Sequence, residues 1–114
     1  MIINPKNEIE YNTFKNTPGK LVVVFFNASW HRQSKSIVPT FFEFSNKYKD
    51  EAVFISVDVD QFENATLEDL DDVKTIPFFK FFHNGMLLQQ FSGAYKSNLY
   101  HTIETQLNIH FRGK

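Results

Sequence analysis

Two short, strongly apolar stretches, the first of them uninterrupted, constrain the fold of this chain more than any other feature of its sequence. Residues 21–26 read LVVVFF and residues 53–58 read VFISVD. Continuous runs rich in β-branched residues are typical of strands that are buried on both faces of a sheet. A stretch with helical spacing of its apolar residues, 34–49, lies between the two runs. The sequence therefore predicts an α/β protein built around a pair of parallel strands.

The rest of the chain extends this pattern to the order β-α-β-α-β-α-β-β-α. The expected elements are a short edge strand at 1–4, a helix at 7–16 capped by Asn7, the helix at 34–49 with Pro39 inside it, a short helix around 66–70, strands at 78–82 and 86–91, and a helix at 95–107. Asn84-Gly85 is a strong signal for a tight hairpin between the last two strands. This order predicts a central mixed sheet of four or five strands with helices on both faces, in a single domain of residues 1–114.

The charge balance argues against several classes of partner. The chain has 12 Lys and Arg residues against 13 Asp and Glu, which gives a formal net charge of −1. No excess of positive charge is left for a nucleic-acid backbone or an anionic membrane surface. The run at 21–26 is too short to span a bilayer, and the N-terminal residues do not resemble a signal peptide. We therefore expect a cytoplasmic protein that binds neither nucleic acid nor membranes.

The junction between the first buried strand and the following helix carries the most specific motif. Trp30-His31-Arg32-Gln33-Ser34 follows FNAS and precedes KSIVP. This arrangement resembles the active-site region of the thioredoxin family, in which a strand leads into Trp-Cys-Gly-Pro-Cys and a helix with a proline one turn in. The resemblance continues through VDVD at 57–60, VKTIP at 73–77, FFHNG at 81–85 and FSGA at 91–94. It covers nearly the whole chain and implies the thioredoxin fold.

The departures from the family motif bear on function. His31 and Ser34 occupy the two cysteine positions, Arg32-Gln33 replaces Gly-Pro, and by the resemblance Phe25 stands where the family has a buried aspartate. Dithiol–disulfide exchange needs an attacking thiolate and a second sulfur, and this chain contains no cysteine. The prediction is a redox-inactive, thioredoxin-like protein that is not an enzyme and has no catalytic residue, metal or cofactor.

The resemblance also indicates a groove that could hold a partner. It implies that the bond before Pro77 is cis and that the Ile76 backbone is open to an extended peptide, which would pair with it as an added strand. Trp30 is expected on the rim, opposite Gly93 and Ala94. His31 and Arg32 lie at a helix start, where His31 is expected to be neutral and to accept a hydrogen bond. The predicted partner-binding residues are Trp30, His31, Arg32, Ile76, Pro77, Gly93 and Ala94, and the predicted partner is a protein or an extended peptide.

Two other functions stay open at this stage. The chain could be a structural subunit that uses other faces of the fold within a larger assembly. A thiol-independent enzyme, with His31 as base and Ser34 as nucleophile, lacks a neighbouring carboxylate to orient the histidine. Each groove residue also has a purely structural interpretation: the cis bond as architecture, Trp30 as a cover for the helix end, and the helix start as a solvated turn.

Overall fold

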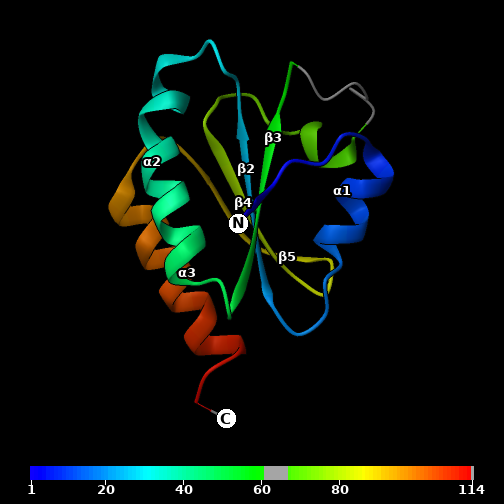
Figure 1. The fold of residues 1–114 in the computed structure, drawn as a ribbon, viewed down its shortest axis with the longest axis vertical. Helices are drawn as coiled ribbons and strands as arrows, with labels where there is room; N and C mark the ends of the chain where they lie inside the picture. Colours follow the sequence, from blue (N-terminus) through cyan, green and yellow to red (C-terminus); the bar gives the residue numbers. More distant parts are fainter. Residues whose placement is uncertain (61–66, 114) are drawn as a thin grey trace.

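The computed structural model describes residues 1–60 and 67–113 (Figure 1). Five strands form one mixed sheet in the order β1-β3-β2-β4-β5. Their bounds are β1 (Ile2–Ile3), β2 (Leu21–Asn27), β3 (Ala52–Asp58), β4 (Phe78–His83) and β5 (Met86–Ser92). β3 is parallel to both β1 and β2, whereas β4 is antiparallel to β2 and to β5. The predicted α/β fold, with parallel crossovers followed by a terminal hairpin, is confirmed.

Helices cover both faces of this sheet. Helices α2 (Arg32–Lys47) and α3 (Lys96–His110) lie on one face, and α1 (Glu8–Lys15) lies on the other with a short 3₁₀ helix, η1 (Glu68–Leu70) (Figure 1). The predicted short helix begins at 66, outside the described residues, so only its end can be compared with η1. None of the helices in the described ranges is long and apolar enough to cross a membrane.

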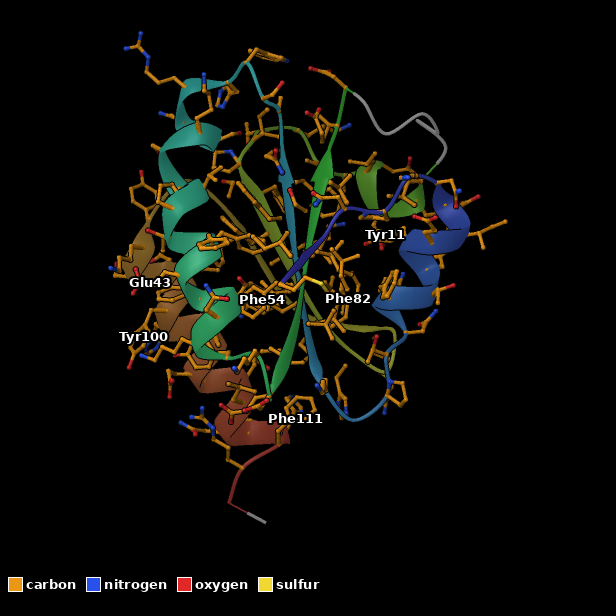
Figure 2. The ribbon with its side chains drawn as sticks, in the orientation of Figure 1. Tyr11, Glu43, Phe54, Phe82, Tyr100 and Phe111 are labelled. Atoms are coloured by element: carbon orange, nitrogen blue, oxygen red, sulfur yellow. The ribbon has the colours of Figure 1, made fainter. Side chains whose placement is uncertain are left out.

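The continuous apolar run predicted for the centre of the sheet contributes to two separate cores. Alternate residues of a strand point to opposite faces, so Val23 and Phe25 pack against α2 and α3, while Val22 and Val24 pack on the side of α1. All six residues at 21–26 are buried, with exposed fractions of 2% or less. Phe54 and Phe82 show the same division, since they face opposite sides of the sheet in Figure 2.

The helix boundaries differ from prediction where a cap was not foreseen. Asn7 caps α1 as predicted, because its side chain accepts a hydrogen bond from the Glu10 backbone N–H at 2.9 Å. Helix α2, however, begins at Arg32 rather than at 34 and ends at Lys47 rather than at 49. Helix α3 begins one residue after the predicted 95 and continues to His110, three residues beyond the predicted 107.

Two backbone features lie at opposite ends of β4. Asn84 and Gly85 have φ angles of 51° and 81°, which is the left-handed conformation that the predicted hairpin turn requires. The peptide bond between Ile76 and Pro77 is cis, and β4 begins directly after it. The chain therefore enters β4 from a turn that lies beside the end of the neighbouring strand β2.

Candidate functional site

The start of α2 is organised by His31. The Nδ1 atom of His31 accepts a hydrogen bond from the Ser34 backbone N–H at 3.2 Å, so His31 is the N-cap of the helix. This role requires Nδ1 to carry no proton, in line with the predicted acceptor. The Ser34 hydroxyl is also 3.2 Å from Nδ1, but Ser34 is only 1% exposed. A buried hydroxyl at the base of a capped helix is poorly placed to attack a substrate.

Trp30 lies at the surface, as predicted, and it has a partner that the sequence did not reveal. Its side chain is 67% exposed, and its indole Nε1–H donates a hydrogen bond to Oδ2 of Asp60. The Trp30 and His31 rings meet edge to face, with centroids 5.4 Å apart. Asp60 follows β3, whose end is tied to β2 by the Val59 N–H and the Asn27 carbonyl at 2.8 Å. The register of these two strands, which the sequence does not specify, brings Asp60 to Trp30.

The space below the start of α2 is filled by aromatic rings. Phe25, in β2, stacks on Phe79 of β4 with centroids 5.0 Å apart and ring planes at 8°. Phe41 of α2 lies 4.9 Å from Phe25 and 5.3 Å from Phe54 of β3. All four residues are at most 2% exposed. Phe25 therefore belongs to a dry, apolar cluster of rings, and none of these rings can accept or transfer a proton.

The turn before β4 places an open backbone next to this region. Pro77 is buried, and its carbonyl accepts a hydrogen bond from the Gly93 N–H at 2.8 Å. Ile76 is half-buried, and within the described ranges no backbone group bonds to the Ile76 N–H or carbonyl. The Pro77–Gly93 bond fixes the turn against the end of β5, so the Ile76 backbone is held in place while its polar groups stay free.

Two hollows lie near this turn. The first has a volume of about 250 Å³ and is lined by Gln33, Ser36, Gly93, Ala94 and Tyr95. The second has a volume of about 330 Å³ and is lined by Val59, Leu70, Val73, Lys74 and Ile76. Of the predicted partner-binding residues, Gly93 and Ala94 line the first hollow and Ile76 lines the second. Trp30, His31, Arg32 and Pro77 line neither of these two hollows. The sequence analysis missed Tyr95, although it follows Ala94 directly, and it missed the apolar residues of the second hollow, where Val59 comes from a distant segment.

The close approach of Tyr95 to Gly93 shapes the first hollow. Gly93 has a φ of 109°, and a Cβ atom there would lie 2.5 Å from Cε2 of the Tyr95 ring. Only glycine fits this conformation and this contact without displacing the ring. Tyr95 itself is 61% exposed, so the hollow has an aromatic wall that is open to solvent.

Arg32, His83 and His110 are further side chains that could bind an anion or a metal ion. Arg32 is exposed, and no side chain in residues 1–60 or 67–113 pairs with it. The rings of His83 and His110 lie 5.7 Å apart, a proximity that the sequence analysis did not foresee. Among the described residues, no group of three or more His, Asp or Glu side chains is arranged to hold a metal ion.

Comparison with known proteins agrees with this fold. A mixed sheet of this order, with a cis-proline turn beside the start of a proline-containing helix, defines the thioredoxin class of proteins. The thioredoxin family profile matches residues 3–105, so the chain belongs to the thioredoxin family. Thioredoxin from Ovis aries is 38% identical over 104 residues, which are 90% of this chain and 96% of that protein.

Two further relatives give the same result. Thioredoxin from Gallus gallus is 43% identical over 86 residues, which are 75% of this chain and 79% of that protein. The solved structure of Plasmodium falciparum thioredoxin superposes with a TM-score of 0.80 at 30% identity, and the match covers 90% of this chain and 97% of that one. The predicted family and fold are therefore confirmed.

Proposed function

We propose that this chain is a redox-inactive thioredoxin-like binding protein that holds an extended protein segment at the cis-proline turn. The observation that carries the proposal is the combination of a chain without cysteine and an intact turn at Ile76–Pro77 whose backbone is unpaired. A sulfur-free site cannot exchange disulfides by itself. A fixed, unpaired backbone beside an exposed aromatic side chain can still bind a peptide.

The position of the two hollows supports an extended ligand. Ile76 lines one hollow, while Gly93, which is hydrogen-bonded to Pro77, lines the other. Alternate side chains of an extended peptide point in opposite directions. A peptide that pairs with Ile76 can therefore direct successive side chains into the two hollows, with Trp30 as an exposed aromatic anchor at the rim.

A photocrosslinking experiment tests this proposal. Because the chain has no natural cysteine, an introduced cysteine is the only site that a thiol-reactive label can modify. We would introduce a single cysteine by Gln33→Cys at the first hollow, attach a benzophenone, and irradiate in native lysate. Ile9→Cys, on the opposite face of the sheet and 78% exposed, is the matched control site. We expect a crosslinked partner from position 33 and not from position 9.

Substitutions in the site then distinguish a real ligand from random capture. Trp30→Ala should weaken the crosslinked partner's affinity by about 2 kcal/mol, or roughly 30-fold, as loss of an aromatic anchor does. Ile76→Arg should have a comparable effect, because the larger charged side chain fills the second hollow. A partner that crosslinks equally from position 9 and tolerates both substitutions would instead support a structural subunit that uses other faces of the fold.

A further inference from the structure

Lys80 is a buried cation with no role in the site described above. It lies in the middle of β4, opposite Val24 of β2, and is only 3% exposed. Lysine is rarely buried to this extent unless its charge is paired, because removal of an ammonium group from water is costly. The partners of Lys80 therefore indicate which part of the structure depends on it.

Both hydrogen-bond acceptors of Lys80 belong to the segment that precedes the cis-proline turn. Its Nζ donates to the backbone carbonyl of Asp69 at 2.9 Å and to Oδ1 of Asp72 at 2.6 Å. The ammonium group also lies 5.9 and 6.0 Å from the ring centroids of Phe26 and Phe78. The hydrogen bond from Lys80 lowers the pKa of the Asp72 carboxyl, so this carboxyl is ionised at neutral pH.

The same segment is attached to α1 through a second set of contacts. The Tyr11 hydroxyl donates to Oδ2 of Asp69 at 2.6 Å, and the Lys15 ammonium lies 3.0 Å from the same oxygen. Lys15 also lies over the Phe82 ring, 4.9 Å from its centroid. The turn at 69–72 is therefore held from one side by α1 and from the other by β4.

This attachment determines where the open backbone lies. Only residues 73–76 separate Asp72 from the cis bond, and Val73 and Ile76 line the same hollow as Leu70. A fixed turn at 69–72 and a fixed β4 leave this short connection little freedom. Without the Lys80 bonds, the turn would keep its apolar contacts and its link to α1, but its connection to β4 would lose both directional hydrogen bonds.

We propose that Lys80 is a positioning residue, which holds the loop at 69–76 so that the Ile76 backbone and the second hollow keep the shape that a peptide needs. This inference rests on the proposed function and adds to it a residue that does not touch the ligand. The Asp72 side chain is 58% exposed, so loss of Lys80 leaves no buried charge unpaired, and an apolar residue of similar size can replace its buried stem at little cost. The role of Lys80 is therefore to fix geometry, and Lys80→Met should leave overall stability largely unchanged while it loosens the loop.

Limited digestion with trypsin under native conditions tests this role without any ligand. Lys74 lies in the loop and is exposed, so cleavage after Lys74 reports the open population of the loop. Loss of charge-assisted hydrogen bonds should accelerate this cleavage about tenfold in Lys80→Met. Asp72→Ala removes one acceptor from an exposed side chain and should act in the same direction. Lys96→Met, which removes an exposed lysine 3.7 Å from Glu43, is the matched control and should have no effect.

The double variant shows whether Lys80 and Asp72 act through each other. Asp72→Ala should add little in the Lys80→Met background, since the shared interaction is already lost. Unchanged cleavage after Lys74 in both single variants would overturn the proposal. Equal acceleration at Lys74 and at a lysine outside the loop, such as Lys47, would also overturn it, because that pattern reports loss of stability of the whole protein.

A separate readout connects the loop to binding. The crosslink from the benzophenone at position 33 should fall about tenfold in Lys80→Met and be retained in Lys96→Met. If the protein with Gln33→Cys as its only substitution gives no crosslink at all, the proposed function fails. The trypsin comparison still decides whether Lys80 holds the loop, so the two failures are distinguishable.

Discussion

Phe25→Asp is the most direct test of the dry cluster below the start of α2. It puts a carboxylate where, by the family resemblance, thioredoxins carry one, and Phe25→Ala serves as the reference for the lost ring. Phe25 is 2% exposed and packs against Phe79 and Phe41 at 5.0 and 4.9 Å. Every buried side-chain polar atom in the described residues already has a hydrogen-bond partner, so no free donor awaits a new carboxylate.

The magnitude follows from two separate costs. Removal of a buried phenylalanine ring costs about 3–5 kcal/mol, which includes the contacts that Phe25 makes with two other rings. A buried polar group without a partner adds about 1–3 kcal/mol. Because small domains are stable by only about 5–15 kcal/mol, Phe25→Asp should lose a large part of the free energy of unfolding at neutral pH, and more of it than Phe25→Ala loses.

The free energies of unfolding of Phe25→Asp and Phe25→Ala should approach each other as the pH falls. Burial raises the pKa of the introduced carboxyl above the ordinary aspartate value of about 3.9. The charged form is the one that the folded state disfavours, so the extra penalty is largest at neutral pH and shrinks as the pH falls towards 4. Comparison of the two variants at the same pH cancels the titration of all other groups.

Urea unfolding at pH 7 and at pH 4.5, followed by circular dichroism, measures both effects. The free energy of unfolding of Phe25→Asp should lie below that of Phe25→Ala at pH 7, and the gap should narrow at pH 4.5. Equal stability of the two variants at pH 7 would refute the reasoning. It would mean that water or a donor reaches this position, and that a proton-accepting group is tolerated there.

Two further predictions concern the ends of helices. The Arg112 guanidinium donates hydrogen bonds to Glu51 at 2.7 and 2.8 Å and to Glu104 at 2.8 Å. The bond from Arg112 lowers the pKa of Glu51. The pKa of Glu104 is lowered first by the Tyr48 hydroxyl and then by Arg112. This stabilisation is present above the unfolded glutamate pKa of about 4.3 and is lost at lower pH, so Arg112→Met should cost about 1 kcal/mol at pH 7 and less at pH 3 in urea titrations. His31→Ala removes the cap of α2 and should cost about 1 kcal/mol with an unchanged urea m-value, while His31→Asp, which retains an acceptor, should cost less; equal losses in the two variants would contradict the capping role.

The sequence was sufficient for the fold because its strongest local signals agree with the tertiary structure. The run at 21–26 is buried on both faces of the sheet, and Asn84-Gly85 forms the tight turn. The start of α2 was placed two residues late because His31 is not among the favoured capping residues. The sequence analysis expected His31 to accept a hydrogen bond near the helix start, but not that the acceptor would be the cap that begins the helix at Arg32.

The site could be predicted only where its chemistry is local. The absence of cysteine and the exposure of Trp30 follow from the motif itself. Asp60, by contrast, reaches Trp30 through the register of β2 and β3, and the second hollow combines Val59 with residues from the loop at 70–76. In the sequence, Lys80 is a single polar residue within an aromatic strand. Its role is not visible there, because its acceptors lie 8 and 11 positions earlier in the chain. Such contacts depend on strand pairing, which no short window of sequence records.

The residues that stand in the catalytic positions of the family also bear on the choice between a binding protein and an enzyme. His31 is engaged as a helix cap, Ser34 is buried beneath it, and Phe25 belongs to a stack of rings. Each of these side chains therefore has a structural role, and the Ser34 hydroxyl and the Phe25 ring are buried away from solvent. The parts of the site that face outward include the Trp30 and Tyr95 rings, the Arg32 side chain and the unpaired backbone at Ile76. An interior that is used for packing, together with exposed aromatic rings and a free backbone outside it, is the argument for our proposal of a binding protein rather than an enzyme.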